Sequence, residues 1–149
     1  MSQYAANTSV SVDKSQAEIR RSLNRYGAGQ FVFAEEDARA MIGFTMANRQ
    51  VRFFLSFKAK SKFMFTSKGR ARKESQALVE WEKACRQKWR ALALIVKAKL
   101  EAVESGITTF EEEFLAHIVL PGGKTYGQFA IPQIEEAYAT KKLPKLLPM

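Results

Sequence analysis

Two short runs in which every second residue is apolar, separated by only four residues, constrain the fold more than any other feature of the chain. Every second residue of 40–46 and 51–57 is apolar: Ala40, Ile42, Phe44, Met46, Val51, Phe53, Leu55 and Phe57. A period of two is typical of β-strands that rest one face on a core. The connection around Asn48 and Arg49 favours a hairpin, because asparagine tolerates a positive φ. The runs therefore predict two adjacent antiparallel strands.

A helix and a further strand are predicted before this hairpin. Asp13 is the expected N-cap of the helix, apolar residues follow it at helical spacing, and Gly27 stands where a helix would stop. Phe31–Phe33 is rich in β-forming residues and ends at the turn-like Glu35–Asp37. Residues 1–12 are small and polar, and we expect them to be flexible.

The longest regular element is predicted from Ser75 to Glu104. Its apolar residues recur at steps of three and four: Leu78, Trp81, Cys85, Leu92, Val96, Leu100 and Val103. Trp81 and Trp89 lie on or beside this stripe, so we expect them in the core or at an interface. Ser105–Gly106 ends the helix.

Shorter elements are predicted after it. Thr108–Glu111 is typical of a capping box that opens a short helix from Phe110 to about His117. A tight Pro-Gly-Gly turn follows at residues 121–123, and Pro132 is expected at the start of a final helix. The sequence thus predicts one α+β domain over residues 13–149. It comprises an N-terminal helix, a three-stranded antiparallel meander, a long basic amphipathic helix and a helical C-terminal portion.

Residues 58–73, here called the basic segment, carry seven Lys or Arg and no Asp or Glu. The segment lies between the strands and the long helix, as either a β-finger or a disordered loop. Ordinary surfaces mix charges of both signs, so an acid-free run favours a polyanionic partner over a merely solvated loop. Phe63 and Phe65 lie inside the run, where they either stack on bases or pack on the sheet.

The long helix continues the positive charge. Residues 58–99 hold thirteen Lys or Arg and three acids, a net charge of +10 in a protein of +9, so the rest sums to −1. Lys83, Arg86, Arg90 and Lys97 fall within about 60° on a helical wheel. The residues predicted to contact nucleic acid are Arg49, Arg52, Lys58, Lys60, Lys62, Phe63, Phe65, Lys68, Arg70, Arg72, Lys73, Lys83, Arg86, Arg90 and Lys97.

The residues that serve most catalytic or metal sites do not form a recognisable pattern. Glu111–Glu113 suits the first turn of a helix, where acids interact well with the dipole. A small Mg²⁺-dependent nuclease would need converging carboxylates, and Asp37 with Glu35 or Glu36 is the place to look. One cysteine, Cys85, and one histidine, His117, provide neither a zinc cluster nor a nucleophile with its base. We therefore expect no cofactor, no metal and no enzyme.

Composition and the N-terminal residues indicate the compartment. The 46% apolar fraction excludes a fully disordered chain, and no apolar run is long enough to span a bilayer. The first residues lack a secretory pattern, and a single cysteine agrees with a reducing environment. We expect a cytoplasmic protein, in the host cytoplasm if a phage encodes it.

The stretch Trp89–Pro132, WRALALIVKAKLEAVESGITTFEEEFLAHIVLPGGKTYGQFAIP, resembles a family of small, largely uncharacterised proteins of phages and prophages. The resemblance extends upstream through Arg39–Phe44 and covers about two thirds of the chain. It implies a phage setting, where compact basic proteins commonly act on DNA.

The predicted order of elements is also similar to the β-β-β-α core of single-strand annealing recombinases, including the Erf and Red-beta types. That resemblance implies rings or filaments that hold single-stranded DNA in a basic groove beside the sheet and the long helix. Arg49, Arg52 and Lys58, residues 60–73, and Arg86 with Arg90 would line the groove.

We therefore predict non-catalytic, sequence-tolerant binding of nucleic acid, preferably single-stranded DNA, in phage replication or recombination, with strand annealing by a homo-oligomer as its most concrete form. The alternative is a phage protein-interaction module that binds or inhibits an acidic host protein, or an accessory virion component. A small nuclease is the third reading. Charge alone does not separate DNA from RNA.

Overall fold

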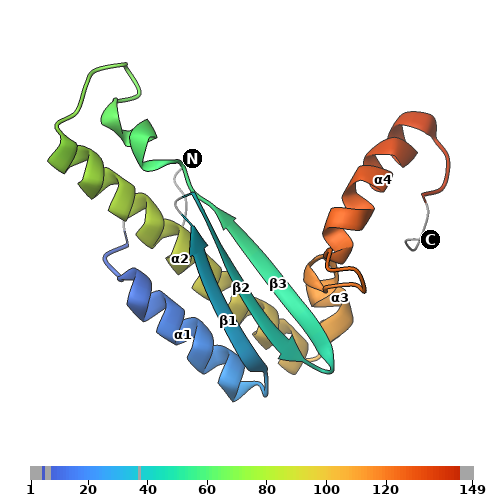
Figure 1. The fold of residues 1–149 in the computed structure, drawn as a ribbon. Coiled ribbons are helices and arrows are strands. Elements are labelled where there is room, and N and C mark those ends of the chain that lie inside the picture. Colours follow the sequence, from blue (N-terminus) through green and yellow to red (C-terminus); the bar gives the residue numbers. More distant parts are fainter. Residues whose placement is uncertain (1–4, 6–7, 37, 145–149) are drawn as a thin grey trace.

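The three predicted strands form one antiparallel sheet in the computed structural model, which describes residues 5, 8–36 and 38–144. Strands β1 (Gly29–Glu36), β2 (Arg39–Met46) and β3 (Arg49–Ser56) lie in the order β1-β2-β3 (Figure 1). The predicted meander and the α+β class are confirmed.

Two helices cover one face of this sheet (Figure 1). α1 (Val12–Arg25) and α2 (Glu74–Glu104) run side by side in the same direction. The guanidinium of Arg90 forms an ion pair with Glu18, and the hydroxyl of Tyr26 donates a hydrogen bond of 2.6 Å to Glu101. Each contact joins α1 to α2, so the two helices form a single layer.

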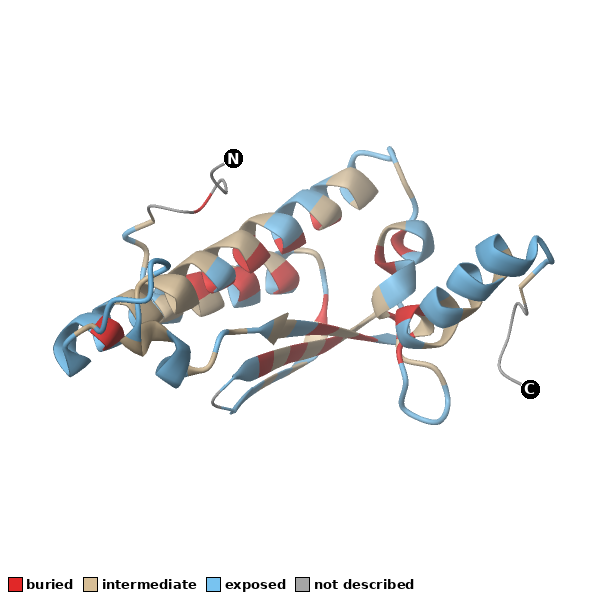
Figure 2. Ribbon diagram, turned by 90° about the horizontal axis from the view of Figure 1, so that it is seen from above, coloured by how far each residue is buried: buried red, intermediate tan, exposed pale blue. Residues whose placement is uncertain are grey.

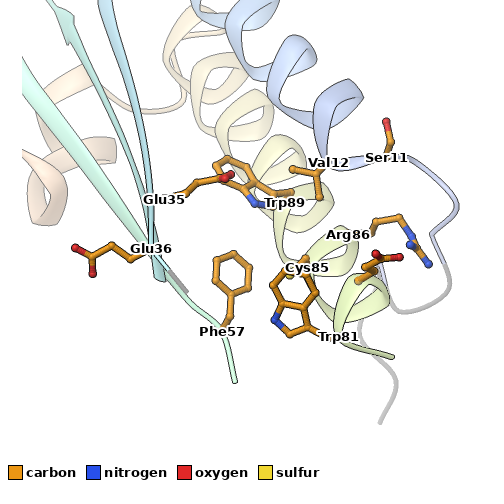
Figure 3. Close-up of a pocket in the computed structure, with 10 residues that line it drawn as sticks. Ser11, Val12, Glu35, Glu36, Phe57, Trp81, Cys85, Arg86 and Trp89 are labelled. Carbon is orange, nitrogen blue, oxygen red and sulfur yellow. The ribbon is translucent and has the colours of Figure 1, made fainter. Parts of the chain in front are cut away.

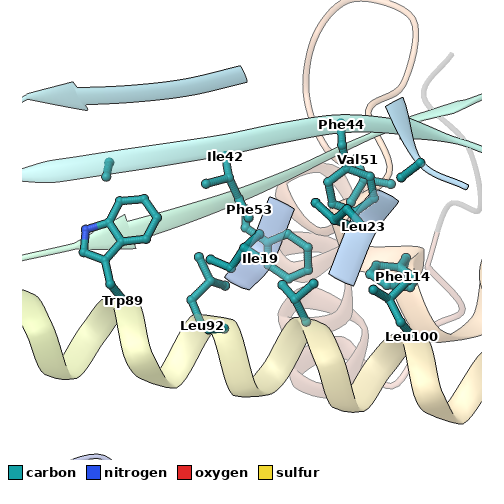
Figure 4. Packing of buried hydrophobic residues seen from close by; sticks show 14 of the residues in the cluster. Ile19, Leu23, Ile42, Phe44, Val51, Phe53, Trp89, Leu92, Leu100 and Phe114 are labelled. Carbon is teal, nitrogen blue, oxygen red and sulfur yellow. The ribbon is translucent and has the colours of Figure 1, made fainter. Parts of the chain in front are cut away.

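The core lies between the helix layer and the sheet (Figures 2 and 4). Both strand runs supply it through alternate residues, as the period of two predicts. Its largest members are Ile19, Leu23, Ile42, Phe44, Val51, Phe53, Trp89, Leu92, Val96, Leu100, Phe110 and Phe114. Trp89 is 2% exposed, which confirms its prediction as a core residue.

Local backbone geometry and capping explain where β2 and β3 turn and where the first helix begins. Ala47 and Asn48 have φ of +51° and +59°, so the β2–β3 turn lies one residue before its predicted place. This pair of positive φ values matches the twist of the two strands. The N-cap of α1 is Ser11, whose hydroxyl accepts from the N–H of Lys14, and not Asp13. Of the predicted flexible N-terminus, residues 1–4 and 6–7 lie outside the described residues, and Val12 is helical.

The turn between β1 and β2 is shorter than predicted. Glu35 and Glu36 belong to β1 and pair with Ala40 and Arg39 of β2. The strand pairing therefore extends through residues that the sequence assigned to the turn. Asp37 lies outside the described residues.

Of the two helix starts predicted in the C-terminal portion, the one at Phe110 is confirmed and the one at Pro132 is wrong. α3 (Phe110–Phe114) begins after Thr109, whose hydroxyl accepts from the N–H of Glu112. α4 (Tyr126–Thr140) begins after Thr125, which forms a capping box with Gln128, so Pro132 lies inside the helix. The capping box satisfies the backbone N–H groups of Thr125 and Gln128, seven and four residues before the proline, and this local bonding decides where the helix starts.

α4 is joined to the domain through the short 3₁₀ helix η2 (Leu115–His117). Gly127 packs so closely that a Cβ built on it would lie 2.8 Å from the backbone oxygen of Ala116. Beyond this contact the helix projects from the end of the sheet (Figure 1). Its residues Ile131 and Tyr138 are 55% and 84% exposed.

Candidate nucleic-acid interface

The basic segment is neither a long β-finger nor a structureless loop. Its first part is the 3₁₀ helix η1 (Lys60–Met64), which packs against α2. The Lys60 ammonium lies 5.1 Å from the centroid of the Trp81 ring on that helix. Such a cation–π contact fixes one end of the segment to α2.

The rest of the segment is a tight turn closed by backbone hydrogen bonds. A single antiparallel bridge joins Phe65 to Ala71. The N–H of Thr66 donates to the oxygen of Arg70 at 2.7 Å, and Gly69 provides the φ of +82° that the turn needs. The charged side chains on this turn therefore project from a defined backbone.

Arg72 has a structural role in this arrangement. Its Nη1 donates to the carbonyl oxygens of Phe63 and Phe65, at 3.2 and 3.4 Å. The guanidinium therefore ties the returning chain to the end of η1. Hydrogen bonds from a charged donor contribute more than neutral ones, so Arg72 is a positioning residue of the segment.

Five other cations of the segment are exposed, and their charged side-chain groups have no hydrogen bond, ion pair or ring contact within the described residues. They are Lys58, Lys62, Lys68, Arg70 and Lys73. No acid lies among them in the sequence to offset their repulsion. A dense set of uncompensated cations on an ordered backbone is what a polyanion would neutralise.

The two aromatic residues of the segment differ in exposure. Phe65 is 58% exposed, whereas Phe63 is half-buried. Phe65 stands between the cations of η1 and those of the turn, so its ring is open to a base. Phe63 contributes to packing.

A hollow of about 510 Å³ separates the turn from the first turns of α2. Arg70 and Arg72 line one side, and Val79, which is 58% exposed, lines the other. α2 begins after Lys73 without a side-chain cap, so the positive end of its dipole adds to the local field. Glu80 at the same hollow offsets part of that charge.

The basic face of α2 extends this field only in part. Arg90 is paired with Glu18, so its charge is compensated. Arg86 lines a separate cavity, described below. Lys83 and Lys97 have no ion pair within the described residues, and Lys97 is exposed.

Arg49 and Arg52 are not brought to the basic segment. They lie near the start of β3, and the strand rises about 24 Å over its eight residues before the segment begins. Arg52 lies on the face away from the helices, where its Nη1 donates to the oxygen of Gly123 at 2.8 Å. On the same face Phe54 is 50% exposed, with the Arg52 guanidinium 5.9 Å from its ring centroid. The structure does not unite all fifteen predicted residues in one groove.

The acids predicted as the place for a nuclease site do not converge. Glu35 accepts a hydrogen bond of 3.0 Å from Gln16, and Glu36 accepts one of 2.8 Å from Arg39. That hydrogen bond, with the charge of Arg39, lowers the pKa of Glu36. Neighbouring strand residues point to opposite faces. Among the described residues there is no group of three or more His, Cys, Asp or Glu that could hold a metal.

The lone histidine and cysteine are both in structural surroundings. The His117 ring stacks on Phe53 with centroids 4.0 Å apart. Burial, with the nearby Lys99 ammonium, lowers the pKa of His117. Burial also raises the pKa of the Cys85 thiol, and Glu35 acts in the same direction, so the thiol is not activated as a nucleophile.

Comparison of the chain with protein-family models, with curated proteins and with solved structures finds no match. Over the part of the chain that the structure describes, no helix has both the length and the apolar composition needed to cross a bilayer.

Proposed function

We propose that this protein binds nucleic acid without strong sequence preference, and single-stranded DNA above other forms. The observation that carries the proposal is the ordered basic segment, with five exposed cations that lack partners and the exposed ring of Phe65 among them. The cations neutralise phosphates and release counterions, while the aromatic ring stacks on a base. No bond is made or broken.

We also propose a role in phage replication or recombination, with strand annealing by a homo-oligomer. What supports it is the order of elements: helix, three-stranded meander, basic connection, long helix. This order is the basis of the resemblance to annealing proteins, and it is a fold-level analogy. An annealing protein needs a backbone-reading surface that tolerates any sequence, which suits the basic segment.

Two triple variants of equal charge test the site. Lys68→Ala/Arg70→Ala/Lys73→Ala removes cations of the turn and keeps Arg72, which holds the segment together. Lys14→Ala/Arg21→Ala/Lys124→Ala removes three exposed cations elsewhere. Binding of a labelled oligothymidylate is measured by fluorescence anisotropy, and far-UV circular dichroism confirms that both variants fold.

The first variant should bind far more weakly than the control. On a single strand each phosphate contact contributes about −0.7 to the slope of log K against log salt. Three contacts therefore strengthen binding on the order of 100-fold when salt falls from 1 M to 0.1 M, and the variant should lose this gain. The control should stay within a few-fold of the wild type. Equal losses in both variants would show that only net charge matters and would refute the assignment of the site.

The second candidate is a protein-interaction module, and the exposed residues Ile131, Ile134 and Tyr138 on α4 favour it. Pull-down from host lysate with and without nuclease separates the two functions. If nuclease removes every partner, the protein binds nucleic acid. If one protein remains bound after nuclease, the interaction module is correct.

A further inference from the structure

A second cavity, of about 490 Å³, lies between the start of α1, the end of β1 and α2 (Figure 3). Phe57, Trp81 and Trp89 line it with aromatic surface, and Val12 and Cys85 add to the apolar wall. Its volume is in the range of pockets that hold ligands or several side chains. The proposed nucleic-acid site uses none of these residues.

The rim of this cavity is acidic although the protein is basic. Glu35 and Glu82 line it with a single cation, Arg86, a net charge of −1 in a protein of +9. Glu36 also borders the cavity, but its carboxylate is paired with Arg39 and points away from it (Figure 3). Glu82 is exposed and has no hydrogen bond or ion pair within the described residues. Aromatic walls under an acidic rim fit an occupant that is both cationic and apolar.

The chain itself carries such a segment directly after α4. Lys141, Lys142 and Leu143 are all exposed, and Leu143 is 96% exposed. The sequence continues with Pro144 and then Lys145-Leu146-Leu147, so residues 141–147 hold three lysines, three leucines and no acid. We call residues 141–147 the basic tail. Its charge and its apolar side chains complement the cavity.

The cavity and residues 141–143, the start of the basic tail, lie at opposite ends of the described part of the molecule. The cavity is beside the first half of α2, whereas α4 follows the end of α2 and projects from the far end of the sheet (Figures 1 and 2). From Trp81 to Glu104 alone α2 rises about 35 Å. Residues 141–143 are therefore far from the cavity of their own copy, so an occupant of this kind has to come from a second copy.

We propose that the basic tail of one copy docks in the aromatic, acidic cavity of the next. Lysines of the tail pair with Glu82 and Glu35 at the rim, and the leucines pack on Phe57 and Trp81. Because donor and acceptor are different surfaces, the contact repeats into a ring or a filament. This inference rests on the homo-oligomer included in the proposed function, and it names the surfaces that join the copies.

Charge reversal on each side of the contact tests it. The tail variant is Lys141→Glu/Lys142→Glu and the cavity variant is Glu82→Lys. Glu104→Lys, an exposed acid near the other end of α2, is the control. Mass is measured by size-exclusion chromatography with light scattering over a range of protein concentrations. All four positions are exposed, so the variants should fold.

The wild type and the control should associate, and each reversed variant should need at least tenfold more protein to do so. An equimolar mixture of the tail and cavity variants should associate again, because each reversed surface then meets a reversed partner. A cavity variant that is monomeric while the tail variant still associates would show that something other than the tail fills the cavity, and would overturn the proposal. A monomeric wild type, or a mixture that does not recover, would also overturn it.

A separate readout distinguishes this proposal from the proposed function. Oligothymidylate binding of the tail and cavity variants is measured with a probe too short to hold two copies. If the variants are monomeric and still bind it in a salt-dependent way, both proposals stand. If neither the wild type nor any variant binds the oligothymidylate, the proposed function is refuted. The docking proposal is then decided by the masses from light scattering alone.

Discussion

Phe65 and Phe63 give the sharpest mutational contrast in the basic segment. Phe65 is 58% exposed, so little of its ring takes part in the fold. Stacking of a base on an aromatic ring contributes about 1–3 kcal/mol by alanine substitution, which is roughly 5- to 150-fold in Kd. Phe65→Ala should therefore weaken binding of single-stranded DNA by that factor and leave the free energy of unfolding nearly unchanged.

Phe63→Ala should show the opposite pattern. A fully buried phenylalanine costs about 3–5 kcal/mol when cut to alanine, so a half-buried one costs roughly half of that in stability. Phe54→Ala is the matched control, because Phe54 is 50% exposed but lies on the outer face of the sheet.

Anisotropy with an oligothymidylate and with a duplex of the same length measures affinity, and urea unfolding measures stability. Phe65→Ala should affect the single strand only, since duplex bases are already stacked. A loss of the same size on the duplex, or no loss on either, would refute base stacking by Phe65. A similar loss in Phe54→Ala would show that the basic segment is not the specific site.

Three further predictions concern the fold. Gly127→Ala should destabilise the protein by about 1–3 kcal/mol and shift α4, because the new Cβ would lie 2.8 Å from the Ala116 oxygen; hydrogen exchange should rise in α4 first, and unchanged exchange would contradict the close packing. Ala47→Asn should stabilise the hairpin by about 0.5–1 kcal/mol in urea unfolding, since asparagine tolerates the φ of +51° better than alanine; a lower stability would contradict this. The lowered pKa of His117 means that the unfolded state binds the proton more readily, so stability should fall as pH drops below about 6.5. His117→Gln should flatten that fall between pH 7 and 5; an unchanged pH profile would show that His117 does not cause it.

Periodic patterns predicted the regular elements well. The alternation in residues 40–57 fixed which faces of β2 and β3 meet the core, because a one-residue shift would expose Phe44 and Phe53. The steps of three and four predicted α2 to within one residue of its start.

Positions governed by local bonding were predicted less well. The final helix starts at Tyr126 because Thr125 and Gln128 cap each other, a pairing that Pro132 obscured in the sequence. The turn at Ala47 was missed because alanine seldom adopts a positive φ. In each case the stronger local signal belonged to a neighbouring residue.

The site could be predicted as a charged segment but not as a geometry. The sequence does not distinguish an unpartnered cation from one that binds another part of the chain. In the structure Arg72 donates to the carbonyl oxygen of Phe63, and Arg90 forms an ion pair with Glu18. The acidic cavity went unnoticed because its residues come from four separate segments of the chain. Glu82, an acid within an otherwise basic stretch, was the available signal.

The salt dependence of single-stranded DNA binding tests the central claim most directly. If the five unpartnered cations of the basic segment contact phosphates, log K should fall against log salt with a slope of about −3.5, so affinity drops on the order of 500-fold between 50 and 300 mM salt. An affinity that changes little over this range would contradict nucleic-acid binding by the basic segment.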